Sequence, residues 1–417
     1  MIQRIKNLRE DELVKGSFVL FFLIVVYNLF NYVFQISMAK MLGPEDYGIM
    51  AALMSIIYIF SIPSEAVQTM ITKYTSVLIP SNGHGKVKDL LIRVLKKSLI
   101  FATLIFIIYV IISVLFLSEF LDISLDLMIF TGLFIFVVFS LPAIRGVIQG
   151  MKRFSTLGFN LITEACIKVV LSLFLVFIGW KVFGSIAAVL LASILTFFIS
   201  LRVIKPILAS KRETQLFKNR YLGNLPILIA TTAVVLMYSL DIILARRFFS
   251  STIAGQFAFV SLIGKVIIFV GSSIGKTMFP ISSEQFSKGN NTKKLLIKSL
   301  LMVSAFSLAS LLLYYLVPGE IIRLISLGSD QYIGASNILF ILGASYSLLS
   351  ISYLIILYRL SINVNRFVYS ILIFVLIQLI LLLVFNSNLL EYSLAILFSN
   401  FLLFIYSVLM LRNAQKN

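Results

Sequence analysis

The feature that most limits what this chain can fold into is a series of long apolar runs that follow one another along almost its whole length. About 20 apolar residues cross the hydrocarbon core of a bilayer as a helix, so runs of about this length are interpreted as membrane spans. Apolar residues make up 60% of the 417 residues and charged residues only 12%, and the mean hydropathy is +1.05. A soluble fold could not bury that much apolar surface. The sequence therefore predicts an all-α polytopic membrane protein.

Twelve transmembrane helices are predicted from the hydropathy pattern. They lie at 17–39, 48–78, 98–117, 127–149, 155–178, 184–203, 223–245, 255–281, 299–317, 334–358, 367–385 and 391–411. The first run continues from a polar N-terminal segment without a short hydrophobic region and a small-residue cleavage site, so it is expected to be retained.

The distribution of basic residues tests this count, because a missed span would invert the charge pattern of every later loop. Alternate connecting segments and the termini carry 26 of the 35 lysines and arginines, whereas the opposite loops carry five. The pattern predicts a multi-pass protein of the cell (cytoplasmic) membrane with both termini in the cytoplasm. The net charge of +18 is then explained by topology, and no nucleic-acid partner is expected.

The sequence offers little for catalysis, and we expect that the protein is not an enzyme. Cys166 lies inside an apolar run and His84 in a polar loop, and neither belongs to a metal-binding pattern. The segment from Gly271 to Thr277 resembles a nucleotide-binding loop, but it has three residues where that motif needs four, and it lies within an apolar run. No metal or organic cofactor is expected.

The chain is predicted to be a doubled six-helix unit. A basic linker at residues 204–222 separates an N-terminal lobe, 1–203, from a C-terminal lobe, 223–417. Four segments recur in order at nearly one offset: Gly48 with Gly255 at 207, Thr69-Met70 with Thr277-Met278 at 208, Leu90 to Ile92 with Leu295 to Ile297 at 205, and Arg153-Phe154 with Arg366-Phe367 at 213. An even number of spans per half makes the repeat parallel, with a pseudo-two-fold axis along the membrane normal and a cavity between the lobes.

Three segments resemble Wzx-type oligosaccharide flippases of the multidrug/oligosaccharidyl-lipid/polysaccharide exporter superfamily. They are the loop Leu42-Gly43-Pro44-Glu45-Asp46-Tyr47-Gly48-Ile49, the run from Arg145 to Phe154, and Asp241-Ile242-Ile243-Leu244. Local physics explains the first only as a tight turn. The resemblance implies two six-helix lobes around a V-shaped central cavity that opens alternately to each side. It also implies a cargo of polyprenyl-diphosphate-linked oligosaccharide repeat units, a membrane-lipid environment and polysaccharide polymerase machinery as a partner.

Charged side chains within the spans are the main site candidates, since each is costly in the membrane unless it is paired or hydrated. Lys265 is the first choice for binding the diphosphate, with a partner on another helix as the alternative. Lys73 and Lys276 occupy equivalent helices and either form a basic cytoplasmic entry or extend to the headgroups. Arg145 either joins that entry or marks the cytoplasmic boundary. Further substrate-binding candidates on the first and fifth spans are Lys168, Asn31 and Gln35.

Three acids are candidates for binding a coupling proton or sodium ion: Glu65, Asp241 and Glu164. Glu65 and Asp241 could instead pair with basic residues across the bundle. Glu164 and Lys168 are four residues apart on one helix face, so the favoured interpretation is that they neutralise each other. Asn31 and Gln35 could bind either sugar hydroxyls or neighbouring helices.

Two rival functions remain from the sequence. A drug or small-cation exporter of the same superfamily would use a few acids in a less basic cavity, whereas Lys265 and Lys168 favour an anionic lipid. A membrane glycosyltransferase or polymerase typically has a large basic external loop, but the longest one here, 318–333, is short. The first span also lacks the arginines found there in the related lipid II flippases, so their phosphate-binding scheme does not transfer.

Overall fold

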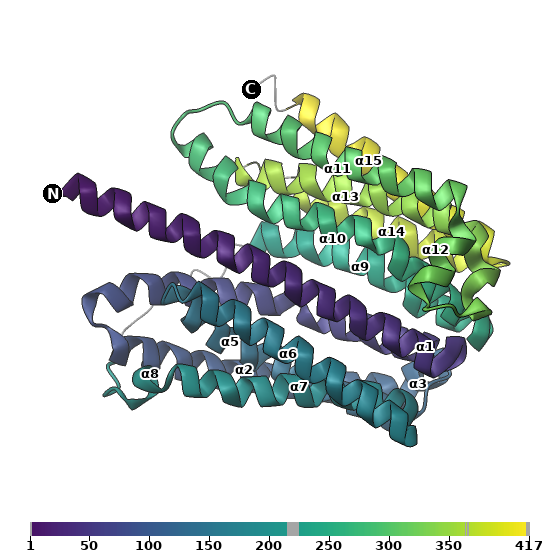
Figure 1. Cartoon of the computed structure of the whole chain (residues 1–417), viewed down its shortest axis with the longest axis horizontal. Coiled ribbons are helices and arrows are strands. Elements are labelled where there is room, and N and C mark those ends of the chain that lie inside the picture. Colours follow the sequence, from purple (N-terminus) through teal and green to yellow (C-terminus); the bar gives the residue numbers. More distant parts are fainter. Residues whose placement is uncertain (1, 215–224, 363, 365–366, 414–417) are drawn as a thin grey trace. The chain divides into compact units, whose positions relative to one another are not determined.

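The computed structural model describes residues 2–214, 225–362, 364 and 367–413, and within this part all regular secondary structure is helical (Figure 1). Before the linker the elements are α1 (Ile2–Leu78), η1 (Ile79–Ser81), α2 (His84–Ile112), η2 (Ser113–Leu117), α3 (Ser118–Leu121), α4 (Leu125–Gly132), α5 (Phe134–Gly150), α6 (Phe154–Leu175), η3 (Val176–Trp180), α7 (Lys181–Val203) and α8 (Lys205–Ala209). After it come α9 (Leu225–Phe248), α10 (Ser251–Ser287), α11 (Lys293–Leu316), α12 (Pro318–Ile325), η5 (Asp330–Ile338), α13 (Leu339–Ser361), α14 (Val368–Val384) and α15 (Leu389–Asn413).

The helices account for the predicted spans. In the described residues, nine helical segments are long and apolar enough to cross a membrane. Two of the nine are broken at a glycine with positive φ, at Gly43 (φ +72°) and at Gly179 (φ +95°). Glycine tolerates this left-handed region without the steric cost of a side chain, which is why the chain can turn there. Each break separates two predicted spans and α14 supplies a shorter one, so the predicted all-α polytopic fold is confirmed.

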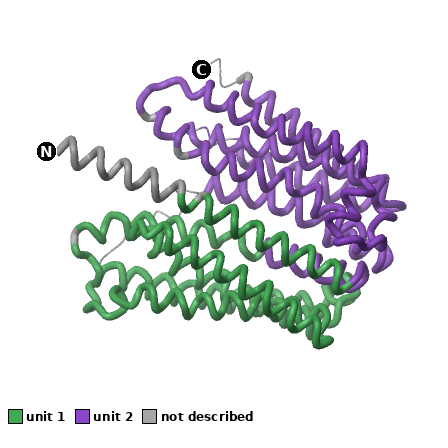
Figure 2. Tube along the Cα trace, in the orientation of Figure 1, with its two compact units in different colours: residues 1–42, 60–221 green, residues 43–59, 222–417 purple. Residues whose placement is uncertain are grey.

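The chain forms two compact units, which Figure 2 distinguishes by colour. Unit 1 consists of Met1–Leu42 and Phe60–Tyr221, and unit 2 of Gly43–Ile59 and Leu222–Asn417. The segment Gly43–Ile59, which the predicted division places in the N-terminal lobe, therefore clusters with the C-terminal helices. The division into lobes at 1–203 and 223–417 otherwise stays a prediction.

Glycines bring the helices of unit 1 close together. A Cβ on Gly146 of α5 would lie 2.7 Å from the carbonyl oxygen of Gln68, and one on Gly150 would lie 2.5 Å from Cβ of Thr75. Two small residues four apart let helix backbones approach in a membrane protein. The Arg145 to Phe154 segment, singled out by its family resemblance, thus has a structural use in packing α5 against α1.

Unit 2 is built around the buried helix α13, against which α10 packs through glycines. A Cβ on Gly271 would lie 1.8 Å from Oγ of Ser350, and one on Gly275 would lie 2.8 Å from Cδ1 of Leu357. The glycines that resemble a nucleotide-binding loop are thus helix-packing residues inside α10.

The start of the predicted linker is folded rather than extended. It contains the helix α8 and then docks on the beginning of α2, where Arg212 Nε lies 2.7 Å from Oδ1 of the buried Asp89. Lys88 Nζ donates to the carbonyl of Ser210 at 2.9 Å, and the amide of Glu213 donates to the carbonyl of Gly85 at 3.2 Å. These contacts fasten residues 205–213 to unit 1.

Candidate functional site

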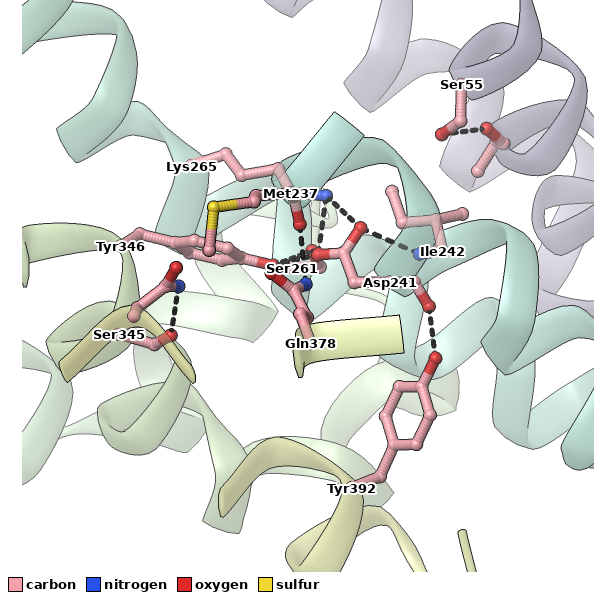
Figure 3. A network of polar contacts seen from close by, with 12 residues as sticks. Ser55, Met237, Asp241, Ile242, Ser261, Lys265, Ser345, Tyr346, Gln378 and Tyr392 are labelled. Carbon is pink, nitrogen blue, oxygen red and sulfur yellow. Dashed lines mark hydrogen bonds and ion pairs between the residues drawn. The ribbon is translucent and has the colours of Figure 1, made fainter. Parts of the chain in front are cut away.

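A buried ion pair lies inside unit 2, between α9 and α10 (Figure 3). Lys265 Nζ lies 3.0 Å from Oδ2 of Asp241 and donates to Oδ1 at 3.1 Å. Asp241 is 0% exposed and Lys265 is 4% exposed. Two opposite charges that share hydrogen bonds in this way form a unit with no net charge, which is the condition for keeping them out of water.

Helix positions explain how the pair is assembled. Ser261 and Lys265 are four residues apart, so they share one face of α10. Asp241 lies seven residues before the end of α9 at Phe248, and that helix extends past the predicted end at 245. This position on α9 is within reach of the long side chain of Lys265.

Hydroxyl groups complete the coordination of the carboxylate. Tyr346 of α13 donates a short hydrogen bond to Oδ2 of Asp241, and Ser261 Oγ lies 2.6 Å from the Tyr346 hydroxyl and 3.4 Å from the same Oδ2. Tyr392 of α15 donates to the backbone carbonyl of Asp241 at 2.7 Å. Four helices thus converge on one acid, and this network holds its position.

The pairing bears directly on the role predicted for Lys265. The alternative of a partner on another helix is the one that the structure displays, because Asp241 accepts the hydrogen bond described for the ammonium and forms its ion pair. Diphosphate binding by Lys265 and coupling-ion binding by Asp241 stay predictions, and each now requires the pair to separate.

A second buried charge cluster lies in unit 1. Arg145 of α5 is within 2.6 Å of Oε2 of Glu164, and its Nε donates to Oδ1 of Asn160 at 2.9 Å. Ser193 of α7 donates to the other carboxylate oxygen at 2.5 Å. Arg145 is therefore not exposed in this structure, because its guanidinium is buried and bonded to side chains of α6.

Glu164 and Lys168 do not form the direct ion pair that their spacing favours, although their charges lie close enough to interact. Glu164 forms its ion pair with Arg145, while Lys168 donates a short hydrogen bond to Oδ1 of Asn31 and lies 4.7 Å from the centre of the Phe34 ring. A helix spacing of four permits a pair but does not impose it, and a guanidinium offers a better hydrogen-bonding fork than an ammonium. Asn31 thus binds a neighbouring helix.

The other predicted site residues lie outside the contacts described for these two clusters. Glu65, Lys73 and Lys276 are exposed, which differs from the buried environment expected for a coupling acid but suits a basic entry. Gln35 is buried on α1. Their proposed roles stay predictions.

Several participants in the clusters are neutral residues that the sequence reasoning missed. They are Ser261, Tyr346 and Tyr392 in unit 2, and Asn160 and Ser193 in unit 1. The available signal was the presence of asparagine and tyrosine inside apolar runs, since polar groups in a membrane must find partners.

Chemically, the described residues of each unit present paired charges and hydroxyls. No group of three or more metal-ligating side chains occurs among the residues the structure describes.

Comparison with known proteins gives a family match and a shared fold. The sequence profile of a family described as polysaccharide biosynthesis protein matches residues 13–286. No curated protein sequence matches the chain.

Solved structures with the same fold are transporters. One is an inward-facing multidrug resistance MATE family transporter of the MOP superfamily, with a TM-score of 0.71 and 14% identity, covering 94% of this chain and 96% of that one. An outward-facing structure of such a transporter has a TM-score of 0.67 and 14% identity, covering 97% of this chain and 95% of that one. A structure of the MATE multidrug transporter DinF-BH has a TM-score of 0.64 and 17% identity, covering 97% of this chain and 95% of that one. At these identities the similarity describes the fold alone.

Proposed function

Because the chain belongs to the polysaccharide biosynthesis protein family and has the fold of MOP superfamily transporters, we propose that it flips polyprenyl-diphosphate-linked oligosaccharide repeat units from the cytoplasmic to the outer leaflet. The observation that carries the proposal is the family match over residues 13–286. A transporter that serves polysaccharide synthesis has to move sugar intermediates, and these are made on a lipid carrier in the cytoplasmic leaflet.

The family membership confirms the predicted resemblance, and it places the protein in a membrane as a multi-span transporter. Its position in the cytoplasmic membrane with both termini inside rests on the charge distribution between loops. Delivery of the cargo to a polymerase on the outer side is part of the same proposal.

The buried ion pair suggests how an anionic cargo could be handled. The exposed Lys73 and Lys276 offer positive charge to an arriving diphosphate. Lys265 then contributes only if its ammonium separates from Asp241, and binding of a proton or sodium ion at Asp241 would allow that separation. Coupling and cargo binding would then meet at one pair of side chains.

The proposal is tested by leaflet exchange of a fluorescent polyprenyl-diphosphate oligosaccharide in proteoliposomes. A membrane-impermeant reductant bleaches only the outer leaflet, so the extent of bleaching reports flipping. We expect exchange that exceeds the rate in protein-free liposomes, and an unchanged rate would reject the flippase assignment.

The role of the pair is tested in the same assay. Lys265→Ala alone leaves a buried uncompensated acid, so the informative variant is Lys265→Ala combined with Asp241→Asn, which keeps the site neutral. Lys294→Ala, at an exposed lysine of the same unit, is the matched control. Loss of exchange in a folded double variant, with a normal control, supports the site; normal exchange in the double variant would make the pair structural.

A further inference from the structure

A buried arginine lies near the end of α13 in unit 2. Arg359 is 5% exposed and comes two residues before the end of that helix at Ser361. Its Nη1 donates a short hydrogen bond to the backbone carbonyl of Met410 on α15, and its guanidinium lies 5.0 Å from the centre of the Phe367 ring, directly before α14. One cation therefore joins the ends of α13 and α15 to the start of α14 (Figure 1).

No carboxylate neutralises this cation among the residues that the structure describes. The guanidinium of Arg359 has the one hydrogen bond to Met410 there, and its buried Nε has no partner. Met410 is among the last four residues of α15, and a helix C-terminus supplies only about half an elementary charge. Residues 363, 365–366 and 414–417 include no aspartate or glutamate. A buried arginine with so little compensation requires a further anion.

The internal repeat indicates what is missing beside this arginine. Arg359 corresponds to Arg145 of unit 1 at an offset of 214, one more than the offset of the Arg153-Phe154 repeat. In unit 1 the guanidinium binds Glu164 and Asn160 on the following helix. The residues at the corresponding places in unit 2 are Ile373 and Ile377 at an offset of 213, and Phe374 and Gln378 at 214. Unit 2 thus keeps the buried arginine without the acid that pairs with it in unit 1.

The surroundings of Arg359 match the phosphate of a lipid headgroup. The loop charges assign this end of the spans to the cytoplasm, and basic pockets between helices on that side bind anionic lipid headgroups. Tyr369, two residues after Phe367, and Leu409, next to Met410, are exposed, so the same helices offer apolar surface to acyl chains. Because no acid pairs with the arginine or could receive a headgroup amine beside it, a lipid with a net charge of about −1 complements the site better than a zwitterionic one.

We propose that unit 2 binds an anionic phospholipid whose phosphate accepts hydrogen bonds from the Arg359 guanidinium. The planar fork of a guanidinium matches the geometry of phosphate oxygens, and such charge-assisted bonds are strong. The bound lipid neutralises the arginine and fastens the three helix ends that meet there. The site needs no transported cargo, so its occupancy can be measured on the purified protein.

Quenching by brominated phospholipids tests the site. Trp180, the sole tryptophan, and Tyr369 are both exposed, so Trp180→Phe combined with Tyr369→Trp places a single indole close to Phe367 in the sequence. In detergent micelles, brominated phosphatidylglycerol should quench this indole at a concentration about fivefold lower than brominated phosphatidylcholine. Arg359→Gln should remove the difference between the two lipids. The matched control is Lys294→Gln, at an exposed lysine of the same unit, which should keep it.

Competitors distinguish a lipid phosphate from other sources of the same group. Unlabelled phosphatidylglycerol should relieve the quenching, whereas equimolar inorganic phosphate or polyprenyl diphosphate should not. Relief by inorganic phosphate would assign the site to a free anion, and relief by polyprenyl diphosphate would assign it to the cargo; either result overturns the lipid site. Equal quenching by the two lipids with Arg359 in place, or a preference that persists in a folded Arg359→Gln, would also overturn it and leave the arginine as a cap of α15. The first of these results requires no change at Arg359, so it holds even if Arg359→Gln does not fold.

Discussion

Replacing Lys265 with methionine should destabilise the protein far more than replacing Lys265 and Asp241 together. The single change leaves the carboxylate of Asp241, which is 0% exposed, without its counter-ion. Breaking a buried pair in this way costs about 3–5 kcal/mol, whereas a neutral replacement of both partners is often nearly neutral.

The contact distances give a similar magnitude. Two unit charges 3.0 Å apart attract by about 5 kcal/mol at an effective dielectric constant of about 20. The hydroxyls of Tyr346 and Ser261 stay beside the acid and recover a small part of this loss. We therefore expect Lys265→Met to cost about 3 kcal/mol or more, and Lys265→Met with Asp241→Asn to cost about 1 kcal/mol.

The measurement is a double-mutant cycle on the free energy of unfolding, obtained by titrating the purified protein in mixed micelles with a denaturing detergent. The cycle isolates the interaction between the two side chains. A coupling energy of about 2 kcal/mol or more is expected. Single-variant costs that simply add in the double variant would refute the view that the two charges stabilise each other.

Three further changes probe other contacts. Arg145→Lys should destabilise the protein by about 2 kcal/mol in the same titration, because an ammonium cannot match the bonds of the guanidinium to both Glu164 and Asn160. A variant as stable as the wild type would contradict that geometry. Gln378→Leu should change stability by about 1 kcal/mol or less, since the bond to a backbone carbonyl is lost together with a buried side-chain oxygen that has no partner; a loss well above this would reveal a missing contact. Asp89→Asn should weaken the docking of the linker and speed tryptic cleavage at Arg212 severalfold, and unchanged cleavage would show that the other linker contacts suffice.

The fold was predictable because its main determinants are local in the sequence. Apolar runs of membrane length and the alternation of basic loops depend on residue type and spacing alone, and they gave the all-helical polytopic architecture. The turn at Gly43 was also visible as a glycine followed by proline. The assignment of Gly43–Ile59 to unit 2 was not, because it depends on a close crossing with Gly255, which is distant in sequence.

The sequence identified the charged residues of the site, but not which of them pair with each other. Asp241, Lys265, Arg145, Glu164 and Lys168 stand out because charges in apolar runs are rare and costly. Which charge meets which depends on helix rotation and depth, and these are set by packing contacts between helices. Helix spacing alone favoured a pair between Glu164 and Lys168, but Glu164 forms its ion pair with Arg145 of another helix.

The most direct test of the flippase assignment compares two cargoes in one preparation of proteoliposomes. Leaflet exchange of a fluorescent polyprenyl-diphosphate oligosaccharide and uptake of a cationic dye are measured side by side, with protein-free liposomes as the baseline for each. A lipid-linked oligosaccharide flippase should accelerate exchange of the lipid-linked sugar and leave dye uptake at the baseline. Accelerated dye uptake with lipid exchange at the baseline would contradict the assignment and indicate an exporter of small cations.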